Sequence, residues 1–215
     1  MPDELSHPEL RTAVTGAVAM LFAHGVMSRT GHGDLSARAP DDQLILTEPG
    51  RLRGLTPGQL AVVSLDGTVR EGHIDALKAE IAELHARIYR LRPDIGCIIH
   101  THSAHVLAFA LAGRPLPCNY EAMRFSQPSP VPVVPWERRG TPAWIETILA
   151  CLEEHPGTNA VLQGNHGVLV FGPGTAEAVT TATVLEEAAE AEIHADPLGG
   201  ARPLVLDPGG GAVDP

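Results

Sequence analysis

Two histidines separated by one residue, His100 and His102, end a short apolar run that starts at Ile95. Such a run indicates a buried β-strand, and side chains two positions apart on a strand point to the same face. Two neutral imidazoles on one face can bind a divalent cation such as zinc, iron, manganese or nickel. Two partly buried histidines that bond to backbone groups are the alternative, and an isolated pair of this kind is weak evidence for a metal site.

A third histidine, His166, lies in the sequence GNHG at residues 164–167. Apolar segments at 160–162 and 168–171 flank it, which indicates a loop between two strands. Glycine allows the backbone to approach other groups closely, so this loop can place His166 at a site. Taken alone, however, the segment is better explained as a turn that carries an incidental histidine.

The segments that must position these histidines alternate between helical and strand patterns. This alternation predicts an α/β domain with a mixed or antiparallel sheet. At the start of the first helix, Ser6 and Glu9 are spaced for an N-cap and a capping box. Helices are predicted at residues 8–24, 76–91, 104–112, 141–152 and 175–195, and strands at 36–38, 44–46, 60–65, 95–100, 160–162 and 168–171, with an edge strand around Val131, Val133 and Val134.

The composition fits a single domain at residues 1–204, because a chain of 215 residues that is 44% apolar can bury one sizeable core. The Gly- and Pro-rich end at 205–215 is expected to be a disordered tail. The net charge of −11 disfavours nucleic acid and anionic membranes as partners. A small-molecule substrate is the expected partner.

The sequence carries no pattern for export or for a membrane span. Apolar stretches of about 18 residues are absent, and the first residues, MPDELSHPELR, lack the basic start and apolar run of a signal peptide. The three cysteines are odd in number, widely spaced and without a CxxC pair, which is typical of reduced thiols. We therefore expect a cytoplasmic protein.

Together, the two histidine motifs and their surroundings resemble the class II aldolase/adducin family, of the fuculose-phosphate-aldolase type. Most of the resemblance lies in LHARIYRLRPDIGCIIHTHS at 84–103 and NAVLQGNHGVLV at 159–170. The sequence GDLSAR at 33–38 is similar to that family's GNxSxR loop, and TEPG at 47–50 is similar to its TPSG loop. With VLEEAA at 184–189, the resemblance extends from about residue 8 to residue 204.

The resemblance implies a three-layer fold with a mixed, mostly antiparallel sheet flanked by helices, and a homotetramer with active sites at subunit interfaces. It also implies that His100, His102 and His166 bind a divalent metal, zinc first, with manganese, iron or cobalt as alternatives. In such enzymes the metal polarises a carbonyl or enediolate oxygen and stabilises negative charge as a carbon–carbon bond breaks. The implied activity is that of a metal-dependent lyase.

The resemblance also indicates catalytic residues. The family's acid/base glutamate lies four residues before the position of His85, where this chain has Ile81. We expect Glu80 to take this role, because a shifted helix start would bring its carboxylate to the site. The alternative is that Glu80 and Glu83 belong to an exposed ion-pair face. Tyr120 stands where some family aldolases place a proton-donating tyrosine, and a packed aromatic side chain is the alternative.

The two similar loops are expected to contact the substrate through His32, Asp34, Ser36, Thr47 and Gly50. Departures from the family pattern weaken the case for phosphate. The Ser-Ser pair of sugar-phosphate members is replaced by ALKA at 76–79, the family Asn by Asp34, and the Ser of TPSG by Pro49. Lys78, Arg29 and Arg38 supply some compensating positive charge. A carboxylate repels phosphate, so a phosphorylated substrate is disfavoured, and a small carboxylic or phenolic acid is the alternative.

Three classes of function are compatible with the sequence. The first is a carbon–carbon lyase, an aldolase or a decarboxylase, that acts on a small hydroxy, keto or aromatic acid. The missing phosphate-binding residues and the lack of the family's second tyrosine favour decarboxylation somewhat. The second class is an epimerase, a dehydratase or an iron-dependent oxygenase on the same three histidines. The third is a non-catalytic adducin-type module, against which the complete set of histidines argues.

Overall fold

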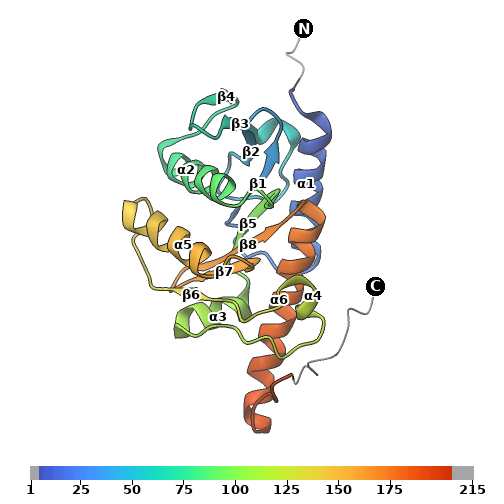
Figure 1. Cartoon of the computed structure of the whole chain (residues 1–215). Helices are drawn as coiled ribbons and strands as arrows, with labels where there is room; N and C mark the ends of the chain where they lie inside the picture. The colour runs from blue at the N-terminus through green and yellow to red at the C-terminus, as the bar shows by residue number, and fades with distance from the viewer. Residues whose placement is uncertain (1–4, 205–215) are drawn as a thin grey trace.

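The computed structural model describes residues 5–204 and shows an α/β fold in which helices cover both faces of one sheet (Figure 1). The expected tail at 205–215 lies outside the described residues. The strands are β1 (Asp34–Ala39), β2 (Gln43–Thr47), β3 (Leu60–Ser64), β4 (Val69–Glu71), β5 (Cys97–Thr101), β6 (Val133–Val134), β7 (Ala160–Gln163) and β8 (Gly167–Gly172). The helices are α1 (Pro8–Ala23), α2 (Ala76–Leu91), α3 (Ala104–Ala112), α4 (Met123–Ser126), α5 (Pro142–Glu154) and α6 (Thr175–Ala195), with 3₁₀ turns at Pro57–Gln59 and Asp196–Leu198.

The eight strands form one sheet in the order β4-β3-β2-β1-β5-β8-β7-β6. Every neighbouring pair of these strands is antiparallel except β6 and β7, which are parallel. The predicted α/β fold with a mixed, mostly antiparallel sheet is therefore confirmed. Each helix and strand expected from the sequence is present, whereas β4 and α4, of three and four residues, are too short to show a period.

Successive residues of β5 alternate between two apolar cores on opposite faces of the sheet. Cys97 and Ile99 pack into one core with α1, α3 and α6, whereas Ile98 packs into the other with α2 and α5. The same alternation directs His100 to the face that α2 and α5 cover. The sheet between two helical layers produces the three-layer fold that the family resemblance implied.

The start of α1 differs from the capping expected from the sequence. Its N-cap residue is His7, which has a φ of 53°, and no side chain of the described residues caps the helix. The hydroxyl of Ser6 instead bonds to the carboxylate of Glu71 on β4, which also pairs with the buried Arg11 (2.6 Å, Nη2 to Oε1). The predicted capping box is wrong, because the fold brings a charged partner that competes for the serine hydroxyl.

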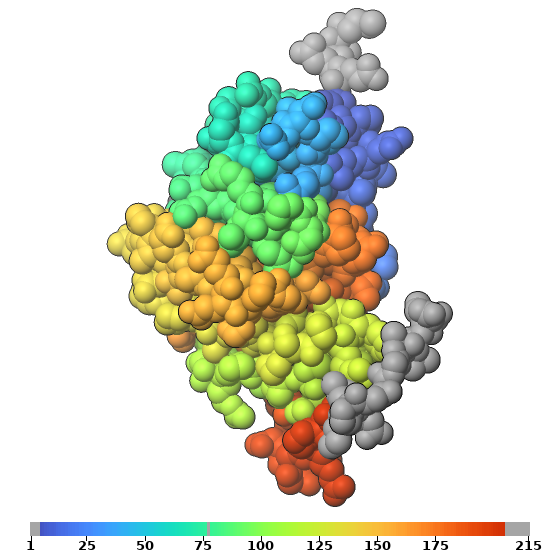
Figure 2. Space-filling view, viewed as in Figure 1, coloured from blue at the N-terminus to red at the C-terminus, as the bar shows by residue number. Residues whose placement is uncertain are grey.

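The longest described helix, α6, packs against α1 and α3, and its last turns project beyond the rest of the molecule (Figure 1, Figure 2). Near this end, Ile193 is 36% exposed and Leu198 is 88% exposed, so apolar side chains meet solvent there. Within residues 5–204, no helix is both long enough and apolar enough to cross a lipid bilayer.

Candidate metal centre

The three predicted metal ligands come together at one end of the sheet. β5 lies between β1 and β8, and Asp34 at the start of β1 is paired with His100 on β5. His102 directly follows β5, and His166 ends the turn that joins β7 to β8. Because β5 and β8 are antiparallel, the end of β5 meets the turn that precedes β8.

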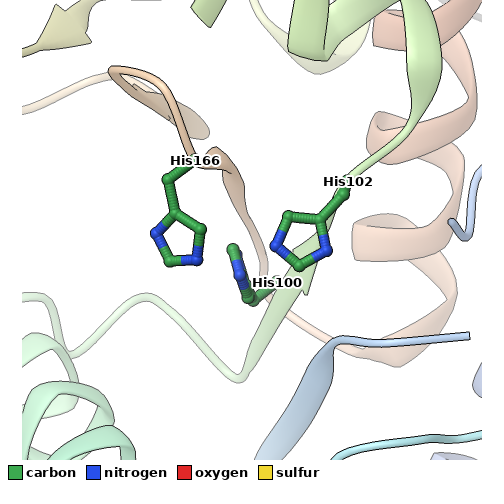
Figure 3. Close-up of side chains that lie close together, drawn as sticks. All are labelled: His100, His102 and His166. Carbon is green, nitrogen blue, oxygen red and sulfur yellow. The ribbon is translucent and has the colours of Figure 1, made fainter. Parts of the chain in front are cut away.

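The three imidazole rings face one another (Figure 3). The ring centroid of His100 lies 4.6 Å from that of His102 and 4.7 Å from that of His166, and the latter two are 5.3 Å apart. One ring nitrogen from each histidine lies within 4.8 Å of those from the other two. The cluster can therefore hold one metal ion.

The β7–β8 turn depends on two special backbone positions. Asn165 has a φ of 57°, a left-handed conformation that asparagine tolerates better than most residues. Its N–H donates to the carbonyl of Ala110 (3.1 Å). At Gly167, a Cβ atom would lie 2.6 Å from the oxygen of Thr101 and 2.7 Å from the ring of His102. Glycine thus lets β8 approach the end of β5 closely enough to bring the rings together.

The orientation of His100 is set by the backbone of β8. Its Nδ1 lies 3.1 Å from the carbonyl oxygen of Val168. The amide nitrogen of Gln163 lies farther from the same Nδ1, at 3.3 Å. A carbonyl oxygen only accepts hydrogen bonds, so the shorter contact with Val168 favours a proton on Nδ1, and that tautomer leaves the Nε2 lone pair free to bind a metal. Metal-binding histidines commonly donate their second ring nitrogen in this way.

Burial favours the neutral form of all three imidazoles. It lowers the pKa of His100 to about 3, against the opposing charge of Asp34, and lowers the pKa of His166 to about 4. The pKa of His102 is also lowered, again mainly by burial. Neutral imidazole is the form that binds metals. Three such donors fit a divalent cation and leave coordination positions for a substrate.

A cavity of about 540 Å³ lies in front of the histidines. Its volume is typical of a site for a small molecule. Besides the three rings, the cavity is lined by residues of the segment 28–34, by Gly50 and by Arg139. The first turns of α2 and its N-cap residue contribute Lys78, Ile81 and Asp75.

The match to a known family covers most of the chain. The family model described as Class II Aldolase and Adducin N-terminal domain matches residues 13–193. The chain belongs to this family. The resemblance drawn from the histidine motifs is thereby confirmed.

Relatives of this class II aldolase/adducin chain include a decarboxylase and an aldolase. It is 32% identical over 191 residues to the 3-oxo-tetronate 4-phosphate decarboxylase of Escherichia coli (strain K12), covering 84% of each chain. It is 26% identical over 181 residues to the 5-methylthioribulose-1-phosphate/5-deoxyribulose-1-phosphate aldolase of Rhodospirillum rubrum, covering 84% of this chain and 79% of that one. The structure of an L-fuculose 1-phosphate aldolase has the same fold, with a TM-score of 0.81, 22% identity and coverage of 95% and 93% of the two chains.

Three of the predicted substrate-binding residues of this family member line the cavity: His32, Asp34 and Gly50. Asp34 is 3% exposed, and one of its carboxylate oxygens lies 3.2 Å from Nε2 of His85. Burial by itself raises the pKa of Asp34, but His85 and the other nearby basic groups together lower that pKa below its ordinary value. Asp34 therefore presents a carboxylate to the cavity.

The other two predicted substrate-binding residues, Ser36 and Thr47, lie behind the cavity wall. The hydroxyl of Ser36 is 2.8 Å from Nδ1 of His85 and 2.9 Å from the hydroxyl of Tyr89. The hydroxyl of Thr47 accepts a hydrogen bond from the backbone N–H of Leu35 (3.2 Å). Both hydroxyls join β1 to neighbouring elements, and substrate contact by either stays a prediction.

The two predicted catalytic residues are not among those that line the cavity. Glu80 pairs with Arg139 (2.5 Å, Oε1 to Nε), and Ile81 lines the cavity instead. Adjacent residues on a helix point about 100° apart, which separates these two side chains. Tyr120 is 41% exposed and lies before α4. The catalytic roles of Glu80 and Tyr120 stay predictions.

Two cations line the cavity: Lys78, which the sequence offered as a compensating positive charge together with Arg29 and Arg38, and Arg139, which the sequence analysis did not name. Lys78 is 5% exposed, and its Nζ has no hydrogen-bond partner among the described residues. Burial lowers the pKa of Lys78, whereas the charge of Asp34 acts in the opposite direction. Its spacing from Ile81 and His85 could have indicated one helix face. Arg139 lies in a loop, where no periodic pattern points to it.

Proposed function

We propose that this chain is a divalent-metal-dependent carbon–carbon lyase, an aldolase or a decarboxylase, that acts on a small hydroxy, keto or aromatic acid. Its strongest support is the convergence of three imidazoles on one cavity. The named relatives include one aldolase and one decarboxylase. Both reactions build up negative charge on an oxygen near the bond that breaks, so one kind of site can serve either reaction.

In this proposal, His100, His102 and His166 hold the cation. Zinc is the first candidate because three histidines and an open position suit it, and manganese, iron or cobalt are alternatives. A cation bound there supplies Lewis-acid stabilisation of the charge that develops on the substrate oxygen. The hydrogen bond of His100 to β8 keeps its ring in a fixed orientation.

The cavity walls are proposed to bind and orient the substrate. Asp34, the first residue of β1, is held beside His85 (3.2 Å). Its carboxylate therefore keeps a fixed position and can accept a hydrogen bond from a substrate hydroxyl. His32 and Gly50 line the same cavity. Glu80 is proposed as the acid/base, for which its carboxylate must leave Arg139 and turn toward the cavity.

A homotetramer is part of the proposal. Large apolar side chains are exposed at Phe125 (75%) and Trp136 (60%), and exposed apolar surface is typical of contacts between subunits. In such an assembly, Tyr120, which is 41% exposed, is proposed to donate a proton at the site of a neighbouring subunit. Sedimentation analysis of the purified protein measures the oligomeric state.

Metal analysis and a substrate screen test the lyase function. Purified protein is expected to hold about one divalent ion per chain and to lose it, together with activity, in the His166→Ala variant. The exposed His24 supplies a matched control, since His24→Ala removes an imidazole outside the cavity. The screen uses small hydroxy, keto and aromatic acids with and without a chelator. Activity that survives both chelation and His166→Ala would refute the proposal.

The same screen separates the alternatives on this site. A lyase releases a smaller fragment, whereas an epimerase or a dehydratase leaves the carbon chain intact. An iron-dependent oxygenase consumes oxygen and holds iron. A non-catalytic module shows neither bound metal nor turnover.

A further inference from the structure

Lys78 is the only lysine in the chain, and it lines the cavity beside the three histidines. The residue is 5% exposed, and its Nζ has no hydrogen-bond partner within residues 5–204. A buried ammonium without a partner is strongly unfavourable, so this group calls for an anion. We propose that Lys78 binds a carboxylate of the substrate while another part of the same molecule lies at the histidines. This inference rests on the proposed lyase function.

Each of the other charged groups around Lys78 lies beside a neighbouring polar group, although Oδ1 of Asp34 makes no hydrogen bond among the described residues. Asp34 lies beside His85 (3.2 Å), and the side chain of Asp75 accepts a hydrogen bond from the backbone N–H of Lys78 (2.8 Å). Arg139 is paired with a glutamate on α2 (2.5 Å). Of the two cations that line the cavity, Arg139 is therefore paired in this structure, whereas Lys78 has no hydrogen-bond partner among the described residues.

The position of Lys78 allows one small molecule to reach both its ammonium and the three histidines. Lys78 and Ile81 are one turn apart on α2, and both line the cavity that the three histidines also line. The cavity of about 540 Å³ is of the size that small ligands occupy. Since Ile81 carries no charge, a substrate arm that lies along this face of α2 meets a single ammonium.

The surroundings of Lys78 favour a carboxylate over a phosphate. The N-terminus of α2, where free N–H groups would attract phosphate, is already capped by the carboxylate of Asp75. The hydroxyls of Ser28 and Thr30, which line the cavity, bond to each other (3.1 Å). A phosphate dianion needs several donors, and Asp34 and Asp75 repel it more strongly than a carboxylate of single charge, which one ammonium matches.

The proposed contact also constrains the reaction. An ammonium stabilises a carboxylate in its charged form, so the carboxylate at Lys78 is one that the reaction retains. A decarboxylase that uses this contact therefore acts on a substrate with a second carboxylate, and an aldolase acts on a hydroxy acid. The substrate class is a small acid whose retained carboxylate lies at α2.

Three hydroxamates, which bind zinc through the same two oxygens, test the inference by calorimetric titration of the zinc-loaded protein. Acetohydroxamate has no further charge, the monohydroxamate of malonic acid adds a carboxylate, and the hydroxamate of phosphonoacetic acid adds a phosphonate. The carboxylate is expected to tighten binding about tenfold or more over acetohydroxamate, as for a charge-assisted hydrogen bond. Lys78→Met is expected to remove this gain without weakening acetohydroxamate, and Lys78→Arg to retain part of it.

A second measurement uses the protein without a substitution, so it does not depend on the folding of a variant. Because Lys78 is the only lysine, protein labelled with ¹⁵N-lysine has a single side-chain amine signal in the NMR spectrum. The malonate-derived probe is expected to shift this signal clearly more than acetohydroxamate does. A structural role of Lys78 alone would not produce this difference between the two probes.

The outcomes distinguish the inference from the function on which it rests. An equal gain from the carboxylate in wild type and Lys78→Met, or equal shifts of the amine signal with both probes, would overturn the role of Lys78. A larger gain from the phosphonate than from the carboxylate would overturn the choice of anion. Failure of acetohydroxamate to bind the zinc-loaded protein would overturn the metal centre, and the inference with it.

Discussion

The ring centroids of His100 and His166 are 4.7 Å apart, although the two residues come from distant segments of the chain. The antiparallel pairing of β5 with β8 brings them together, because the turn before β8 lies at the end of β5. A site built across two strands depends on close backbone packing and on buried, neutral rings. Changes to the packing or to the protonation of the rings should therefore be measurable in stability and metal binding.

The metal-free protein is expected to lose stability as the pH falls below about 6.5. The pKa of histidine in the unfolded chain is about 6.5. In the folded state, burial lowers the pKa of His100 to about 3. Between these values the unfolded chain takes up a proton that the folded state does not. The contribution of neutral His100 to the free energy of unfolding is therefore complete above about pH 6.5 and is lost as the pH falls toward about 3. At about pH 5, the free energy of unfolding is expected to be lower by about 2 kcal/mol for this reason.

Urea unfolding of chelator-treated protein across this pH range measures the effect. His100→Asn is the control, because asparagine does not titrate and the variant should show a flatter dependence of stability on pH. A wild-type profile as flat as that of His100→Asn would contradict the lowered pKa.

Gly167→Ala is expected to disturb the metal centre. Its Cβ would lie 2.6 Å from the oxygen of Thr101 and 2.7 Å from the ring of His102, so β5 and β8 must separate. We expect a loss of stability of about 1–3 kcal/mol and a fall in zinc affinity of about tenfold or more. Gly16→Ala in α1, where a Cβ meets nothing within 4 Å, is the control and should keep the zinc affinity. Equal zinc affinity in both variants would show that the close approach is not required.

Arg11→Met is expected to destabilise the protein without changing its metal content. Arg11 is 1% exposed and bonds to the carboxylate of Glu71 (2.6 Å) and the carbonyl of Leu60 (2.8 Å). Its removal leaves buried acceptors without a partner, for a loss of about 3 kcal/mol. Arg87→Met breaks the more exposed pair with Glu146 and should lose less than about 1 kcal/mol. Chemical denaturation compares the two variants, and similar losses would count against the buried network.

Glu80→Gln tests the acid/base assignment once a substrate is known. Proton transfer by Glu80 predicts a fall in kcat of about 10²- to 10⁴-fold with unchanged metal content. Glu83→Gln, at an exposed position on the same helix, is the matched control. Equal kcat values for the two variants would assign Glu80 to its ion pair with Arg139 alone.

Local patterns in the sequence were sufficient to predict the helices, the longer strands and the three histidines. The apolar run before His100 and the glycine-flanked His166 are features of short segments, and so is the spacing that predicts each helix. The capping of α1 could not be predicted, because the hydroxyl of Ser6 is taken by Glu71, which only the fold brings near.

The sequence by itself determined the longer helices and strands, the family and the identity of the candidate ligands, since each of these is carried by motifs of residues close together in the chain. Only the tertiary structure decided which polar side chains line the cavity. Ile81 and Lys78 line it and Glu80 does not, because the rotation of α2 follows from its packing against the sheet. One residue changes the direction of a helical side chain by about 100°. The spacing of Lys78, Ile81 and His85 indicates a shared helix face, but only the packing of α2 shows that this face meets the cavity.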